Sequence, residues 1–271
     1  MLSQANAYEM KFLFPTGDSV IGASLKEHGE FARPEVDIIC DYLKLSSAPG
    51  TFVDVGANIG SICLPVARRF PDIRVCAIEA HRGLHAILAA NILNNGLFNV
   101  DAVQAAVGPE IGIAQFPATS LRLEGNFGTI GMHMNARVRT ENTRMCTLDE
   151  IAPPDTRFIK MDVEGFEIEV LKGATATVNE TRPAWLVEAN SGLDSVARTC
   201  MQVYLEADYR LYWFFAPFVT GKTMRDKLTG DTNFIAAPKD MPNLWNLTEI
   251  SSVDAERPTH MNGYRYLERY G

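Results

Sequence analysis

The segment TFVDVGANIG, residues 51–60, decides the fold. Its first five residues form a short, nearly continuous apolar run, which is typical of a strand buried on both faces of a parallel sheet. Gly56 and Gly60 then allow a sharp turn into a helix that we expect over residues 61–70. A buried strand, a glycine turn and a helix in this order indicate the start of an α/β domain.

The same alternation of strand and helix patterns continues along the chain. Residues 108–146 interrupt it with a sequence rich in Gly, Asn, Thr and Arg, which predicts an irregular or antiparallel β insertion. Alternation of this kind predicts an α/β fold with a mostly parallel, doubly wound sheet and helices on both faces. Further strands are expected at 73–80, 100–107, 157–163, 183–189, 210–216 and 233–238, and further helices at 82–95, 166–177 and about 193–207.

Three regions are expected along the 271 residues. Residues 1–48 form an N-terminal extension, in which 11–25 predicts a strand, a turn and a second strand, and 34–45 predicts a helix with Pro34 and Glu35 in its first turn. Residues 49–240 form the main domain, and residues 241–271 carry little pattern and form a C-terminal tail.

The composition of the chain makes some classes of function less expected than others. The formal net charge of −8 makes a nucleic-acid-binding surface an unfavoured expectation. Five scattered cysteines contain no CxxC pair and predict reduced thiols rather than disulfides or a zinc site. No signal peptide and no membrane span are indicated, so we expect a cytoplasmic protein. Oligomeric state has no signal in the sequence, although a homodimer is compatible with it.

The turn at 54–60 favours one class of nucleoside ligand. Asn58 stands where the dinucleotide fingerprint has glycine, which disfavours a pyrophosphate bound at the helix start. An acidic residue at the strand end, Asp54, instead suits the cationic amino-acid portion of S-adenosylmethionine. Glu79 ends the next strand, where an acidic residue accepts hydrogen bonds from ribose hydroxyls. A tight turn without a ligand is the simpler alternative for the glycines alone.

Several motifs together resemble one family. The segment FIKMDVEGFEIEVLKGA at 158–174 is the most specific of them, and with the others it makes residues 17–240 similar to the FkbM-type methyltransferases. Ala80 and His81 follow Glu79 where many members carry a proline, which puts the shape of that turn in doubt. The supporting motifs are VDVGANIGS at 53–61, IEA at 78–80, NILN at 91–94, NFGTIG at 126–131 and CTLDEI at 146–151.

The resemblance implies a seven-stranded Rossmann-like methyltransferase sheet that binds S-adenosylmethionine and releases S-adenosylhomocysteine. It also implies O-methylation of hydroxyls on sugars, glycans or other small natural products. Glu79 is implied at the ribose, and Gln104 and Ala105 at the adenine. The residues implied along the rest of the cofactor are Asp54, Gly56, Asn58, Gly60 and Asp162.

The acceptor side needs a base, because a hydroxyl is a poor nucleophile while it is protonated. Asp162 and Glu164, at the exit of the strand 157–163, are the best candidates, with helix N-terminal acids of no catalytic role as the alternative. His133 in the insertion is a weaker candidate base or substrate contact. Glu188 ends the strand 183–189 and is a candidate substrate contact. No metal site is expected, although Asp162, Glu164 and Glu188 offer the oxygen ligands of a divalent cation as a less favoured alternative.

The leading hypothesis is therefore an O-methyltransferase for a small-molecule or glycan acceptor. N-methylation of an amine or guanidine is the alternative within the same chemistry. A non-catalytic cofactor-binding module and a nicotinamide oxidoreductase are alternatives of other classes. Acceptor selectivity is expected to reside in loops and insertions, where sequence patterns carry the least information.

Overall fold

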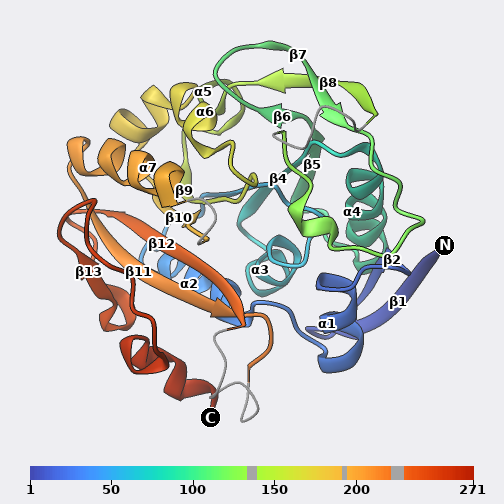
Figure 1. Ribbon diagram of the computed structural model, residues 1–271, viewed down its shortest axis with the longest axis horizontal. Helices are drawn as coiled ribbons and strands as arrows, with labels where there is room; N and C mark the ends of the chain where they lie inside the picture. Colours follow the sequence, from blue (N-terminus) through green and yellow to red (C-terminus); the bar gives the residue numbers. More distant parts are fainter. Residues whose placement is uncertain (133–138, 191–193, 221–228) are drawn as a thin grey trace.

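The computed structural model describes residues 1–132, 139–190, 194–220 and 229–271. Its centre is an eight-stranded sheet with the order β13-β11-β12-β10-β9-β3-β4-β5 (Figure 1). The strands that form it are β3 (Thr51–Val55), β4 (Arg74–Glu79), β5 (Val100–Gln104), β9 (Thr156–Met161), β10 (Ala184–Glu188), β11 (Tyr209–Pro217), β12 (Gly230–Pro238) and β13 (Thr248–Ile250).

The sheet is mostly parallel, as the sequence predicts. Strands β5, β4, β3, β9 and β10 pair in parallel, and β12 then pairs antiparallel with both β10 and β11. The predicted α/β fold with a mostly parallel, Rossmann-like sheet is confirmed. The three-residue strand β13 extends the seven expected strands at one edge, where it pairs with β11.

Helices cover both faces of this sheet. The helix α2 (Arg33–Leu43) packs on α3 (Cys63–Arg69), while α6 (Glu167–Lys172) packs on α7 (Asp194–Glu206) (Figure 1). Strands β3 and β10 are buried along their whole length because they are covered on both sides. The helix α4 (Arg82–Asn95) spans the residues predicted for it and ends at Gly96, whose φ is 64°.

The order in which successive strands are added to the sheet reverses between β3 and β9. From β3 it proceeds outward to β4 and β5, and it later returns to place β9 on the other side of β3. In open α/β sheets a ligand cleft lies at this switch point, outside the carboxyl ends of the strands. The carboxyl ends of β3, β4, β9 and β10 are therefore the place to look for a site.

The N-terminal region differs from the prediction. Its strands are β1 (Leu2–Ala7) and β2 (Met10–Pro15), joined by a turn in which Tyr8 and Glu9 have φ of 51° and 60°. The predicted second strand within 11–25 is wrong, because Ile21–His28 forms the helix α1. Ile21 and Leu25, four residues apart, are both buried, as one face of a helix requires.

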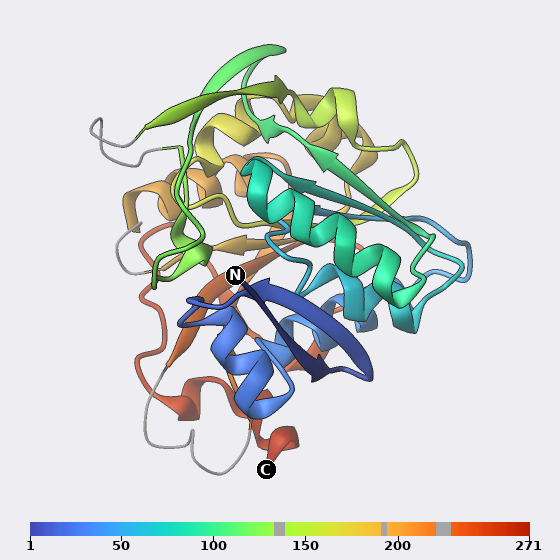
Figure 2. The same cartoon turned by 90° about the vertical axis from the view of Figure 1, so that its right-hand side faces the viewer.

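The hairpin lies beside α4 (Figure 2). The buried Asn91 side chain joins them, because its Oδ1 accepts from the Leu13 N–H at 2.7 Å and its Nδ2 donates to the Leu13 carbonyl at 3.0 Å. The same Nδ2 donates to the Ile59 carbonyl at 2.9 Å, so this amide also supports the glycine turn.

The insertion contains the predicted antiparallel β structure. Strands β7 (Gly112–Pro117) and β8 (Thr140–Cys146) pair antiparallel, and β6 (Ala106–Val107) completes a three-stranded sheet. A 3-10 turn at Phe127–Thr129 and a short helix α5 (Leu148–Ile151) complete this region.

The C-terminal residues are less irregular than their sequence pattern suggests. Beyond β13 they form 3-10 turns at Met261–Gly263 and Arg265–Tyr270, and another turn at Leu244–Asn246 precedes it. The Tyr266 hydroxyl accepts from the Phe215 N–H and donates to the Phe215 carbonyl, both at 2.7 Å, which ties this region to β11. Within the described ranges, no helix is long and apolar enough to cross a membrane.

Candidate active site

A cleft opens over the carboxyl ends of the central strands. Its floor comes from the residues at the ends of β3, β4, β9 and β10, and its walls come from the α1–α2 region, from 105–107 and from the insertion. Among the sequence-predicted residues, those that line it are Asp54, Gly56, Asn58, Glu79, Ala105, Asp162, Glu164 and Glu188. His133 lies outside the described residues.

The glycine turn is shaped by a close approach of two chain segments. Gly56 has φ of 85°, and a Cβ at this position would lie 1.8 Å from the carbonyl oxygen of Asp162. The Asp162 N–H also donates to the Val55 carbonyl at 3.1 Å. Gly60 has φ of 89° and packs on Leu64, outside the cleft lining. Gly56 is thus required by the crossing of the backbone itself, in addition to any ligand, whereas Gly60 is favoured by its positive φ and its packing against side chains.

Glu79 joins the two loops on the β4 side of the cleft. Its Oε2 accepts from the Asn58 N–H at 2.8 Å, and its Oε1 accepts from the His81 N–H at 2.7 Å. Burial raises the pKa of Glu79 to about 7, against the effect of these two donors. Each carboxylate oxygen has a further lone pair, so Glu79 retains the capacity to accept from ribose hydroxyls.

His81, in the turn that follows Glu79, has a structural role. Its Nδ1 accepts from the Leu84 N–H at 3.2 Å, so His81 is the N-cap of α4. Its Nε2 lies 3.1 Å from the Thr119 carbonyl and ties the insertion to this turn. The turn after Glu79 is therefore well defined without a proline.

Two further features of the cleft fit S-adenosylmethionine. Asp54 is 1% exposed, and its Oδ1 has no hydrogen-bond partner among the described residues. Burial raises the pKa of this carboxyl, and a cationic ligand group would offset that cost. Ala105, Ala106 and Val107 provide an apolar wall suited to an adenine ring, whereas Gln104 is exposed and lies outside the lining.

Three carboxylates of the cleft lining lie close together. Asp162, Glu164 and Glu188 each place an oxygen within 4.8 Å of the others. Burial and then the charge of Asp162 raise the pKa of Glu164 to about 8, and the same two causes raise the pKa of Glu188 well above its ordinary value. The Glu188 carboxylate accepts a hydrogen bond from the Asn190 side chain. Asp231, whose burial raises its pKa to about 6, accepts from Asn190 at 3.2 Å.

Lys160 is a site residue that the sequence analysis missed. Its ammonium donates to Asp162 Oδ2 at 2.8 Å. Burial lowers the pKa of Lys160, but the charges of Asp162, Asp54 and Glu35 outweigh burial and raise it well above its ordinary value. The signal was present, since a lysine inside an otherwise buried strand must be paired.

Glu35 was also missed, because it was interpreted only as an acid in the first turn of a helix. It is 3% exposed and lines the cleft, and its Oε1 accepts from Asn233 Nδ2 at 3.0 Å. Burial raises the pKa of Glu35 to about 8, although the Lys160 charge opposes this shift. No local pattern identifies this residue, because its partners lie on β9 and β12.

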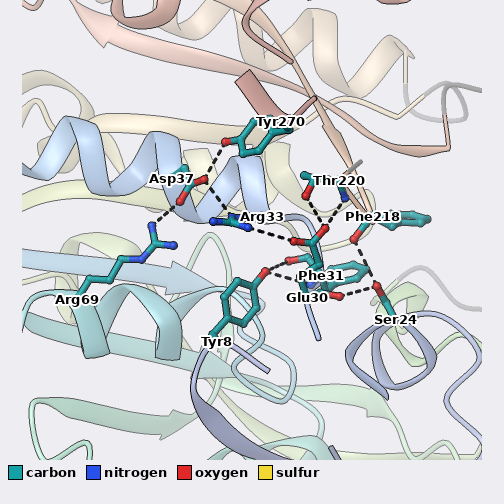
Figure 3. A network of polar contacts seen from close by, with 10 residues as sticks. All are labelled: Tyr8, Ser24, Glu30, Phe31, Arg33, Asp37, Arg69, Phe218, Thr220 and Tyr270. Carbon is teal, nitrogen blue, oxygen red and sulfur yellow. Dashed lines mark hydrogen bonds and ion pairs between the residues drawn. The ribbon is translucent and has the colours of Figure 1, made fainter. Parts of the chain in front are cut away.

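An aromatic pair stands at the wall of the cleft. The rings of Phe31 and Phe218 stack with centroids 5.3 Å apart and an interplanar angle of 18°. Figure 3 shows the polar contacts that hold them: the Tyr8 hydroxyl donates to the Phe31 carbonyl at 2.7 Å, and Thr220 Oγ1 donates to the Glu30 carboxylate at 2.6 Å. The Ala32 N–H also donates to the Phe218 carbonyl at 2.9 Å.

The chain is similar to several known methyltransferases. A methyltransferase from Sordaria araneosa, sdnD, is 28% identical over 185 residues, which cover 55% of this chain and 70% of the relative. The structure of methyltransferase FkbM from Methylobacillus flagellatus KT is similar at 20% identity and a TM-score of 0.49. The similarity covers 69% of this chain but only 43% of that one. The O-methyltransferase TomG from Streptomyces achromogenes is similar at 13% identity and a TM-score of 0.46, over 76% of this chain and 79% of TomG.

The family assignment rests on the sequence match. The model of the methyltransferase FkbM domain matches residues 54–214, more than half of the chain. This range begins at Asp54 and includes Glu79, Lys160, Asp162 and Glu188, and it confirms the resemblance stated from the motifs. The chain belongs to the FkbM family of S-adenosylmethionine-dependent methyltransferases.

Proposed function

We propose that this methyltransferase methylates a hydroxyl oxygen of a sugar, a glycan or another small natural product. The observation that carries the proposal is the position of Asp162. Its carboxylate lines the same cleft as Asp54 and Glu79, and the Lys160 ammonium holds it at 2.8 Å. A carboxylate held in this way, next to a cofactor cleft, is suited to accept a proton from an acceptor hydroxyl.

The proposed cofactor site uses the residues that line the β3 and β4 side of the cleft. Glu79 accepts from the ribose hydroxyls, Asp54 offsets the positive charge of the amino-acid portion, and Ala105 contacts the adenine. Gly56 and Asn58 shape the loop between them. When bound, S-adenosylmethionine supplies an electrophilic methyl group on a sulfonium. Gly60 and Gln104 are outside the lining, so we leave them out of the proposed site.

On the acceptor side we propose different roles for the three carboxyl groups. Asp162 takes the hydroxyl proton, because its side chain is 32% exposed and can reach a bound acceptor. Burial and the charge of Asp162 raise the pKa of Glu164, so we assign the proton transfer to Asp162 rather than to Glu164. Glu188 and Asn190 bind the acceptor by hydrogen bonds. Alignment of the acceptor by such contacts supplies much of the rate in a displacement reaction.

Two measurements test this proposal. Isothermal titration with S-adenosylmethionine and S-adenosylhomocysteine should show binding, and a folded protein that binds neither would refute the cofactor site. Methyl transfer to a panel of hydroxylated acceptors should fall by about 10²–10⁴-fold in Asp162→Asn, as expected for loss of a general base. The control is Glu169→Gln on the surface of α6, which should retain its turnover.

One observation favours the amine alternative. Among the described residues that line the cleft, seven carry carboxyl groups and only Lys160 carries a positive charge. Such a surface also attracts a protonated amine. An amine that reaches the site with its lone pair free needs no strong base, so Asp162→Asn would retain turnover on amines. Retention on amines, together with no turnover of hydroxylated acceptors by the unmodified protein, would establish the alternative.

We also propose a class of acceptor and a cellular location for this methyltransferase. A small-molecule or glycan acceptor, rather than nucleic acid, is supported by the net charge of −8 and by the carboxyl groups of the cleft. A reducing compartment such as the cytoplasm is supported by the five cysteines, all of which are free and buried.

A further inference from the structure

We propose that Asp162, Glu164 and Glu188 bind a divalent cation at the acceptor end of the cleft. They come from two neighbouring parallel strands, since Asp162 and Glu164 follow β9 and Glu188 ends β10. Each offers a carboxylate oxygen, and these oxygens lie within 4.8 Å of one another. All three residues line the cleft, so an ion and an acceptor could meet there.

The state of Glu188 is independent evidence for a missing partner. Glu188 is 5% exposed, and its Oε2 has no hydrogen-bond partner among the residues that the structure describes. The other oxygen of this carboxylate accepts a hydrogen bond from the Asn190 amide. This bond holds the carboxylate in place, and Oε2 can bind a ligand. A buried, unsatisfied carboxylate oxygen costs free energy unless a ligand completes it.

The charges around the cluster also favour the binding of a cation. Asp231 and Glu35 add further carboxyl groups around the cluster. Lys160, which provides the one positive charge in the described lining, is already bonded to Asp162 and is attracted by Asp54 as well. A divalent cation would offset the remaining negative charge more fully than a single lysine does.

Ligand chemistry and spacing identify the class of ion. An all-oxygen set without thiolate or imidazole favours Mg²⁺, Mn²⁺ or Ca²⁺ over zinc or copper. Two oxygens on opposite sides of Mg²⁺ lie about 4.2 Å apart, and about 5 Å apart on Ca²⁺. The separation of up to 4.8 Å therefore fits Ca²⁺ directly and fits Mg²⁺ or Mn²⁺ after a small contraction.

Such an ion would contribute to the proposed reaction by binding the acceptor oxygen. Coordination lowers the pKa of a bound hydroxyl, so a weaker base is sufficient to take its proton. This consequence rests on the proposed O-methylation, whereas the binding of the ion does not.

Mn²⁺ is the probe for the test. The full chain is stripped with a chelator, and the free Mn²⁺ signal is followed by electron paramagnetic resonance during titration. We expect one ion per chain, and we expect Glu188→Gln and Glu164→Gln each to weaken binding by at least about tenfold, the loss typical of removing a metal-supporting group. The matched control is Glu35→Gln, which removes a cleft carboxyl group outside the cluster and should weaken binding clearly less than either cluster variant, because Glu35 is not one of the proposed ligands.

The outcomes separate coordination from general attraction to an acidic cleft. Equal weakening in Glu35→Gln and Glu188→Gln, or no saturable binding by the unmodified chain, would overturn the proposal. Circular dichroism checks the fold of each variant, and Glu164→Gln on the half-buried loop after β9 decides the result if Glu188→Gln does not fold. Methyl transfer at full rate in excess chelator would refute a role of the ion while leaving the proposed function intact. A lack of S-adenosylmethionine binding would refute the proposed function while Mn²⁺ binding could still be observed.

Discussion

Replacement of Lys160 by methionine should destabilise the fold strongly. Lys160 is 5% exposed, and its ammonium is surrounded by the carboxyl groups of Asp162, Asp54 and Glu35. Methionine fills a similar volume but leaves these groups without their cation. Breaking a buried ion pair by removing one partner costs about 3–5 kcal/mol of unfolding free energy. For a chain of this size that corresponds to a fall in Tm of about 6–20 °C.

The loss of unfolding free energy in Lys160→Met should also depend on pH in a definite direction. Burial raises the pKa of Glu35 to about 8 and also raises that of Asp54, and Lys160 opposes both shifts. Without Lys160 the pKa values of these two carboxyl groups rise further in the folded state. At a pH between the unfolded and the folded pKa values, the carboxyl groups are therefore protonated in the folded variant and ionised in the unfolded chain. The destabilisation is therefore fully present above the folded pKa values and decreases as the pH falls through them.

Urea unfolding at pH 8.5 and pH 6 measures both effects. The matched control is Lys172→Met, which breaks the exposed ion pair with Glu169 on α6 and should cost less than about 1 kcal/mol. A loss in Lys160→Met no larger than in this control would refute the view that Lys160 is the cation on which the cleft carboxylates depend. A loss that grows toward pH 6 would refute the electrostatic explanation.

Three further predictions follow from the cleft. Gly56→Ala places a Cβ 1.8 Å from the Asp162 carbonyl, so it should lower stability by more than the roughly 1–2 kcal/mol of a left-handed residue, as measured by urea unfolding. The Kd of S-adenosylhomocysteine, measured by calorimetry, should rise about tenfold from pH 8 to pH 6, because Glu79 has a pKa of about 7 and only its carboxylate accepts two ribose hydrogen bonds. A Glu79→Gln variant should lose most of this pH dependence. Tyr8→Phe leaves the Phe31 N–H and carbonyl without the Tyr8 hydroxyl and should cost about 1–3 kcal/mol of unfolding free energy.

Local patterns predicted the main domain well because its signals lie within single elements. The helix at 82–95 was predicted to the residue, since an apolar run ends at Gly96, where φ is 64°. The strand at Thr51–Val55 was predicted because it is buried on both faces.

The failures have physical causes of their own. The strand Leu2–Ala7 reads LSQANA and has little apolar pattern, because most of its residues are exposed or half-buried. Ile21 and Leu25, four residues apart, fit the period of a strand or of a helix over so short a stretch, and only tertiary packing selects the helix α1. Local sequence patterns could not predict the pairing of Lys160 with Glu35. The two residues are separated by 125 positions, and they acquire their roles only when α2 packs on β9.

The crossing of Gly56 with Asp162 limits how new specificities can be engineered into this scaffold. The two loops touch through backbone atoms at one point, so a segment grafted after β9 from a relative must reproduce the path of the chain at Asp162 or displace Gly56. Chimeras that exchange 160–165 alone would therefore disturb the opposite loop. Substitutions at the aromatic wall, Phe31 and Phe218, vary the cleft without that constraint and are the better starting positions for a library.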